Sequence, residues 1–171
     1  MGDVSIRSFI AIELDDHVKK ELSVLIDTLR MDGQKLVKWV RPAGIHITLK
    51  FLGSIKQSML QPVQNVVEGV CHNSAVFNLS LSGLGFFPGP AKPRVLWIGM
   101  GGDLEELARL QSAIDSGLSR LGFEAEKREF SPHITLGRLD AARLPQDITR
   151  FTSCVLGLKY EAVLKIRVDR V

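Results

Sequence analysis

The tetrapeptide His-Ile-Thr-Leu occurs twice in the sequence, at 46–49 and again at 133–136. Successive side chains of a β-strand point to opposite faces, so the histidine and threonine of each copy share one face, while the isoleucine and leucine share the other. Each copy therefore predicts a strand with one packed face and one face that offers an imidazole and a hydroxyl. Two such strands facing each other would form a polar site. Its members would be His46, Thr48, His133 and Thr135.

The repetition changes how these histidines are interpreted. The chain has only four histidines, and a single His-x-Thr would be explained better by a core or surface histidine than by catalysis. For the pair we favour a functional site, because two occurrences with matching isoleucine and leucine rarely arise by chance. His17, on the polar side of an expected helix, and His72, at a helix end, are interpreted as ordinary structural residues.

Composition is that of an ordinary folded protein. With 171 residues, 45% of them hydrophobic, residues 1–171 can bury a core as a single domain. Cys71 and Cys154 form no Cys-x-x-Cys pattern and lie among apolar neighbours, so we expect buried free thiols and a reducing, cytoplasmic location. No signal peptide is expected, and no apolar run approaches the roughly 20 residues that span a bilayer. A soluble protein without a membrane anchor follows.

Basic residues are concentrated around the first motif. Between positions 33 and 102 the only acidic residue is Glu68, whereas seven residues are basic. The basic ones are Lys35, Lys38, Arg41, Lys50, Lys56, Lys92 and Arg94. This stretch is either a solvated basic face or a surface that attracts phosphate, and the sequence favours neither, because it does not show whether the side chains converge.

Hydrophobic periodicity predicts a mixture of strands and helices. Strands are expected at 8–14, 36–40, 45–52, 77–81, 95–98, 130–136, 155–158 and 162–168, the last two as a closing pair. Alternation in the strand at 45–52 places Phe51 on the packed face with Ile47 and Leu49. The segment 141–152 is expected to be a loop with a short helical turn.

Three helices are expected. The first follows a cap at Asp15 or Asp16, and the second carries an apolar face from Leu60 to Val70. The third is the clearest, with Asp103 as its cap, Glu106 completing a capping box and Gly122 after its end. Similar elements flank each motif, which suggests two duplicated α/β lobes that face one another.

Two imidazoles at one site suit phosphodiester cleavage, because the reaction removes a proton from the attacking oxygen and delivers one to the leaving oxygen near neutral pH. Threonine hydroxyls can donate to the non-bridging phosphate oxygens. A strained cyclic phosphate fits such a site, and no metal or cofactor is required. A metal site is the competing interpretation, but neither motif carries a carboxylate or second histidine at ligand spacing.

Several segments resemble one known family. They are RSFIAI at 7–12, WVRPAGIHITLKFLG at 39–53, RVLW at 94–97 and FSPHITLGR at 130–138. They are similar to the bacterial and archaeal RNA 2′,3′-cyclic phosphodiesterases of the two-histidine phosphoesterase superfamily, formerly called 2′-5′ RNA ligases. The resemblance implies an α+β, bilobal fold of two pseudo-twofold-related lobes, each of antiparallel sheet and helices, around a central cleft. It also implies hydrolysis of cyclic phosphate ends to 2′-phosphomonoesters and reversible 2′-5′ ligation.

The resemblance further implies roles for individual residues. His46 would donate a proton and His133 would accept one, whereas the spacing of the motifs does not distinguish these roles. Phe9 would be a stacking platform for a base, and Arg138 a phosphate clamp. Strict alternation puts Arg138 on the apolar face of Ile134, so it reaches the site only if the strand ends or bulges at Gly137.

Two other classes of protein stay open. The segment VLWIGMGGD at 95–103 resembles part of a nucleotide-binding fingerprint, but Leu104 stands where the third glycine would be, so the glycines are interpreted as a turn before a helix. A catalytically idle RNA-binding protein would use the basic stretch and Trp39, Phe86 and Phe87. The expected partner is an RNA end with a 2′,3′-cyclic phosphate, such as a tRNA fragment, or a small cyclic nucleotide, bound by a monomer.

Overall fold

A computed structural model describes residues 4–33, 35–140, 142, 145–158 and 160–171. The strands are β1 (Ser5–Glu13), β2 (Val37–Trp39), β3 (His46–Lys56), β4 (Phe77–Phe87), β5 (Val95–Gly102), β6 (His133–Leu139) and β7 (Glu161–Val168). The helices are α1 (Asp16–Gly33), α2 (Leu60–His72), α3 (Leu104–Ser119) and α4 (Pro145–Gly157), with short 3-10 turns at Pro42–Gly44 and Gln57–Met59.

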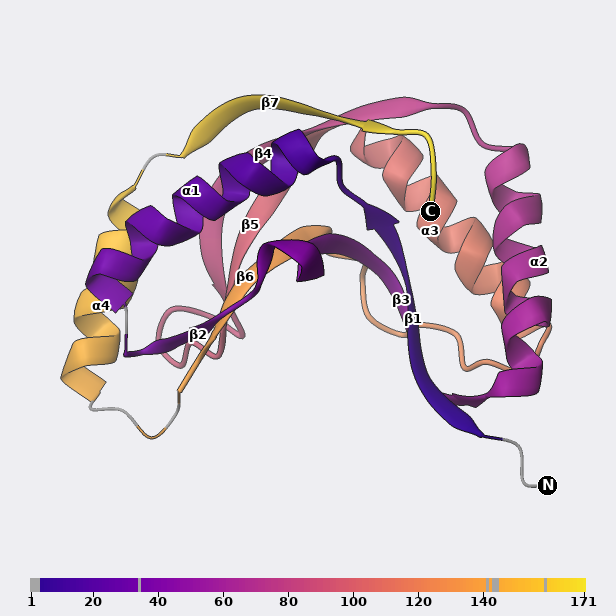
Figure 1. The fold of residues 1–171 in the computed structure, drawn as a ribbon, viewed down its shortest axis with the longest axis horizontal. Helices are drawn as coiled ribbons and strands as arrows, with labels where there is room; N and C mark the ends of the chain where they lie inside the picture. Colours follow the sequence, from indigo (N-terminus) through magenta and orange to yellow (C-terminus); the bar gives the residue numbers. More distant parts are fainter. Residues whose placement is uncertain (1–3, 34, 141, 143–144, 159) are drawn as a thin grey trace.

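Two antiparallel sheets carry the two motifs. The first pairs β1 with β3, and the second has the strand order β2-β6-β5-β4-β7. β2 precedes β3 in the chain yet pairs with β6, with Val37 opposite Leu139. β3 contacts β6, so the strands that begin with His46 and His133 lie next to each other where the two sheets meet (Figure 1).

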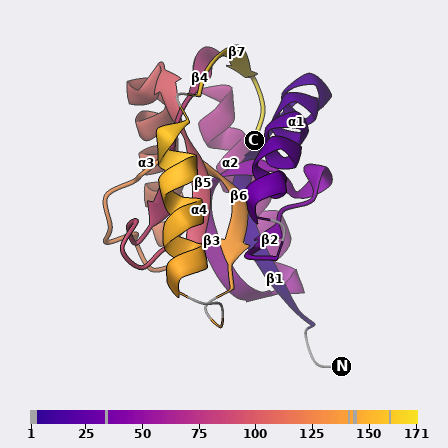
Figure 2. The ribbon, with the colours of Figure 1, turned by 90° about the vertical axis from the view of Figure 1, so that its left-hand side faces the viewer.

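One pair of helices lies at each end of this sheet arrangement. α1 contacts α4, and α2 contacts α3, which Figure 1 shows on opposite sides of the molecule. Figure 2 looks onto α4 with α1 beside it. The inward faces are apolar at helical spacing, and in α1 the side chains of Val18, Leu22, Ile26 and Leu29 are buried. The buried side chains of helices and sheets form one continuous cluster.

The alternation of β3 is interrupted at Leu49. Thr48 pairs with Ala11 and Lys50 with Ile10, so Leu49 has no partner and forms a bulge. Beyond the bulge the faces exchange: Leu49 and Lys50 are both buried, and Phe51 is 72% exposed. The expectation that Phe51 packs inward is therefore wrong, because it assumed a regular strand.

β6 is interrupted at the equivalent position. Thr135 pairs with Trp97 and Gly137 with Leu96, which leaves Leu136 without a partner. Leu136 is fully buried, Gly137 is buried as well, and Arg138 is exposed. Each motif strand thus bulges three residues after its histidine. The irregularity that Arg138 needs to leave the apolar face is present, one residue earlier than expected.

The C-terminal third differs most from expectation. Residues 145–157 form helix α4 rather than a loop followed by a strand at 155–158, and β7 pairs with β4. Phe151, Thr152 and Val155 face inward from α4 at helical spacing. β-branched residues at 148, 149, 152 and 155 favour strands, but burial of this face outweighs that local preference. Positions 141, 143 and 144 of the expected loop lie outside the described residues.

Smaller expectations also need correction. The Asp103 side chain does not cap α3, because its carboxylate accepts a hydrogen bond from the N–H of Asn78 at 2.9 Å. Glu106 pairs with Arg109 instead of completing a capping box. The glycines before α3 lie within β5, and only Gly102, at φ 89°, makes a turn there.

The two thiols are free, as expected, but they are not both buried. Cys71 is half-buried, whereas Cys154 is exposed near the end of α4. Burial raises the pKa of the Cys71 thiol. In the part of the chain that the structure describes, none of the helices has the length and apolarity to cross a membrane.

Gly137 permits β2 to approach β6, and its replacement tests this packing. A Cβ atom at this position would overlap Cγ1 of Val37 and lie 3.3 Å from the carbonyl oxygen of Lys38. We expect Gly137→Ala to lower the free energy of unfolding by about 1–3 kcal/mol. Urea denaturation measures the change.

Gly69→Ala is the matched control, because Gly69 lies within α2 and a Cβ there meets nothing within 4 Å. This change should stabilise the protein by about 0.5–1 kcal/mol. Equal effects at both positions would show that the β2–β6 contact does not require glycine.

Candidate active site

A cleft of about 820 Å³ opens beside the two motif strands. Thr48 of the first motif and His133 of the second both line it, so the fold brings the repeated tetrapeptides to one place. The walls are supplied by β3, by the residues around the β4–β5 connection and by the segment before β6. The remaining lining residues are Leu49, Lys50, Phe51, Phe87, Pro88, Arg94, Val95, Gln111, Glu126, Arg128, Glu129, Phe130 and Ser131.

His46 begins β3 and is covered by an aromatic ring. The ring of Phe9 stacks on its imidazole, with centroids 4.7 Å apart and planes at 24°. Burial lowers the pKa of His46, and a backbone hydrogen bond with Gly44 opposes the shift in part. The free protein therefore favours the neutral imidazole more than an exposed histidine would.

His133 begins β6 and is oriented by its own chain. Its Nδ1–H donates to the carbonyl oxygen of Ser131 at 2.7 Å, which leaves Nε2 for chemistry. The ring of Phe87 meets the imidazole edge-on, with centroids 4.8 Å apart and planes at 76°. Each catalytic candidate thus bonds to the backbone two residues before it, and each has a phenylalanine against its ring.

The two threonines follow the histidines at the expected spacing. Thr48 and Thr135 are both half-buried, and Thr135 lies opposite Trp97 in the sheet. Thr48 lines the cleft, whereas Thr135 and His46 are not among the residues that line it. The cleft is therefore lined by Thr48 of the first motif and His133 of the second. His46 and Thr135 lie on the same two strands, β3 and β6.

The structure places the two residues suggested by resemblance in different settings. Phe9 is 46% exposed and stacks on His46, so it is a surface ring beside the site. Arg138 pairs with Val95, a residue of the cleft, and so shares that face of the sheet. Its side chain lines a separate depression with residues 35–38, 139 and 140.

Sequence reasoning missed several residues of the cleft. Phe51 was assigned to the packed face, and its ring lies 6.2 Å from that of Phe9. Arg128 stands in a stretch without strand or helix periodicity, so no pattern pointed to it. Phe130 was expected to begin the strand at 130–136, but it lies before β6, in a segment without helix or strand. Their position just before the second motif was the one available signal.

Other aromatic candidates separate into core and site. Phe86 is 5% exposed and packs against Phe151, so it belongs to the core. Trp39 also packs edge-on against Phe151. Of the three aromatics proposed for an RNA-binding protein, Phe87 alone lines the cleft. Among the described residues there is no group of three or more histidine, cysteine, aspartate or glutamate side chains arranged to hold a metal ion.

Several known proteins are similar to this chain in sequence and in fold. A model of the 2′-5′ RNA ligase superfamily matches residues 14–170. An RNA 2′,3′-cyclic phosphodiesterase of Methanothermobacter thermautotrophicus is 36% identical over 141 residues, which is 82% of this chain and 74% of that protein. Another from Thermotoga maritima is 34% identical over 136 residues, covering 78% of this chain and 70% of that protein.

Solved structures of other proteins have a similar fold. The crystal structure of a Thermus thermophilus protein has a TM-score of 0.71 at 26% identity, covering 95% of this chain and 84% of that chain. Escherichia coli LigT complexed with 3′-AMP has a TM-score of 0.62 at 25% identity, covering 83% and 79%. The fold and the repeated motif strands define a bilobal α+β phosphoesterase architecture, as expected. The chain belongs to the 2′-5′ RNA ligase superfamily.

The stacked ring of Phe9 gives a direct test of the site's electrostatics. Burial is the largest cause of the lowered pKa of His46, so Phe9→Ala should raise that pKa toward its usual value of about 6.5. An NMR titration of the imidazole C–H signals measures this. Phe51→Ala is the matched control, because its ring contacts Phe9 and has no ring contact with His46. Equal shifts in both variants would contradict the role of the stacking ring.

Proposed function

We propose that this protein hydrolyses RNA 2′,3′-cyclic phosphate ends to 2′-phosphomonoesters by acid and base catalysis from His46 and His133. The observation that carries the proposal is that two copies of His-x-Thr, 87 residues apart in the chain, begin neighbouring strands β3 and β6 beside one cleft. The RNA 2′,3′-cyclic phosphodiesterases among its relatives support the substrate class.

The reaction requires two proton transfers around one phosphorus atom. One imidazole removes a proton from water as the water oxygen bonds to phosphorus, and the P–O3′ bond breaks. The other imidazole protonates O3′, which leaves the phosphate on O2′. No oxidant, nucleotide or metal takes part in this balance. Replacing water by the 5′-hydroxyl of a second RNA gives a 2′-5′ linkage, so ligation needs only the cyclic phosphate.

We propose His46 as the donor and His133 as the acceptor. The Nδ1–H bond of His133 to Ser131 leaves Nε2 as an acceptor when the ring is neutral. The lowered pKa of His46 works against a donor in the free protein. A bound phosphate anion beside the imidazole favours its charged form and raises its pKa, so substrate would prepare the donor.

The hydroxyls of Thr48 and Thr135 are proposed to donate to the non-bridging oxygens, where negative charge grows in the transition state. Arg138 is proposed as a phosphate ligand and Phe9 as a base platform beside His46. The single buried cluster supports one bilobal domain over 1–171, which we propose acts as a monomer. The two free thiols favour a reducing compartment such as the cytoplasm.

Hydrolysis of an RNA bearing a 2′,3′-cyclic phosphate, with EDTA present, tests the proposal. We expect a 2′-phosphate product, and a loss of kcat on the order of 10²–10⁴-fold in both His46→Ala and His133→Ala, because each removes one proton transfer. His72→Ala, on the exposed end of α2, is the control and should retain wild-type turnover.

Other outcomes would point to other functions. A 3′-phosphate product, or activity lost on chelation, would contradict this mechanism. RNA binding without turnover in the wild-type protein would favour the catalytically idle binding protein, and binding of a dinucleotide at the turn before α3 would favour a nucleotide-binding module.

A further inference from the structure

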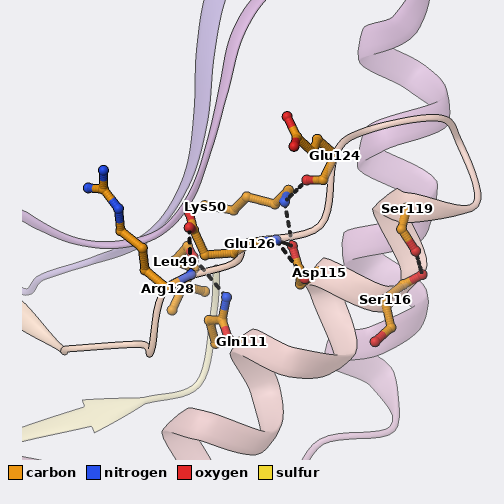
Figure 3. A network of polar contacts seen from close by, with 9 residues as sticks. All are labelled: Leu49, Lys50, Gln111, Asp115, Ser116, Ser119, Glu124, Glu126 and Arg128. Carbon is orange, nitrogen blue, oxygen red and sulfur yellow. Dashed lines mark hydrogen bonds and ion pairs between the residues drawn. The ribbon is translucent and has the colours of Figure 1, made fainter.

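A buried ion pair joins the first motif strand to the segment that precedes the second motif. The ammonium of Lys50 donates to the carboxylate of Asp115 in α3 and, at 2.8 Å, to the carbonyl oxygen of Glu124 (Figure 3). The side chains of Lys50 and Asp115 are 6% and 16% exposed. The bulge at Leu49 explains this placement, because after it Lys50 is buried whereas Phe51 is exposed. Lys50 also lines the cleft.

Asp115 extends the connection to a further residue of the same segment. Its carboxylate oxygens accept the N–H of Glu126 at 3.3 and 3.2 Å. Gln111, one turn earlier in α3, donates to the carbonyl oxygen of Leu49 at 3.5 Å. Residues 123–132 contain neither helix nor strand, so no regular ladder of backbone hydrogen bonds fixes them. The ion pair supplies that constraint at 124 and 126.

The segment held in this way forms one wall of the cleft. Its residues 126, 128, 129, 130 and 131 all line the cleft that contains Thr48 and His133. The side chain of Arg128 is exposed and extends away from the Lys50–Asp115 pair (Figure 3). Within the described part of the chain, no ion pair joins Arg128 to another side chain. The carboxylate of Glu126 accepts the backbone N–H of Arg128 at 3.1 Å.

We propose that segment 124–131, fastened to β3 through Lys50 and Asp115, recognises the RNA strand upstream of the reacting phosphate, with Arg128 binding the phosphodiester of the preceding nucleotide. This inference rests on the proposed function. The cleft volume of about 820 Å³ lies in the upper part of the range for ligand sites, roughly 300–1,000 Å³, which leaves room beyond a reacting cyclic phosphate.

The chemistry of the wall fits a nucleic-acid strand. Arg94 is a second exposed arginine of the cleft, and Phe51 and Phe130 offer rings for stacking. Glu126 and Glu129 are the acidic residues of this wall. Asp115 is not among the residues that line the cleft, and Lys50, which does line it, is held by Asp115. Both therefore act as positioning residues for Arg128.

Two substrates separate recognition from chemistry: a mononucleoside 2′,3′-cyclic phosphate, and a trinucleotide that ends in the same group. The wild-type protein should have the lower KM for the trinucleotide. Arg128→Met should raise the KM for the trinucleotide about tenfold more than that for the mononucleoside, because one charge-assisted contact is lost. Arg120→Met, an exposed arginine outside the cleft, is the matched control and should change neither.

Salt dependence gives a second measure of the same contact. We measure the dissociation constant of the trinucleotide 2′-phosphate product between about 50 and 200 mM salt. The slope of log Kd against log salt concentration should be lower by about 0.7 in Arg128→Met than in the wild-type protein. An equal rise of KM for both substrates, or an unchanged salt slope, would overturn the inference and leave the proposed function standing. A wild-type protein that hydrolyses neither substrate would refute both.

The positioning role needs a variant that folds. Removing one partner would leave the other charge buried, so Lys50→Met is combined with Asp115→Leu, since apolar replacement of a buried pair is often tolerated. The double variant should show the same selective loss for the trinucleotide, with faster hydrogen exchange at the amide of Glu126. A folded double variant with wild-type KM for both substrates would show that the ion pair does not position this wall.

Discussion

The bulge at Leu49 is the constraint on which the site's composition depends. Before it, His46 and Thr48 share one face of β3; after it, Phe51 joins that side and Lys50 turns inward. A regular strand would have reversed the last two, burying the ring of Phe51 and exposing the ammonium of Lys50. The bulge at Leu136 has the same relation to His133, so the two strands share a distortion as well as a sequence.

The placement of Lys50 determines which positive charges in the cleft stay unpaired and so can attract an anion. Its charge is neutralised by Asp115, so it contributes structure rather than attraction for phosphate. A buried pair of this kind contributes little net stability, but the loss of one partner costs about 3–5 kcal/mol, which makes its geometry hard to change. The positive charge at the cleft comes instead from Arg94 and Arg128, which line it together with the imidazole of His133 and the hydroxyl of Thr48. Of the seven basic residues between positions 33 and 102, Lys50 and Arg94 line the cleft, and Lys50 is already paired.

Much of the fold could be predicted wherever a local pattern coincides with tertiary packing. α1, α2 and α3 and the cores of β1, β3, β5 and β6 follow from periodicity, because each buries one face against the rest of the protein. α4 was missed because its β-branched residues favour strand locally, while the packing of Phe151 and Val155 selects helix. The prediction that Asp103 caps α3 was wrong because its carboxylate accepts a hydrogen bond from the N–H of Asn78, on a neighbouring strand.

The spacing of histidine and threonine within each motif, and hence the pair of polar groups on one face, was contained in the chain itself, since strand alternation is a local property with a period of two residues. The partner strands β1 and β5 decide where that alternation breaks, because in their register Leu49 and Leu136 have no partner residue. The cleft wall likewise depends on Lys50 meeting Asp115, 65 residues away in sequence. No local pattern encodes such a contact, because it exists only once distant segments have packed together.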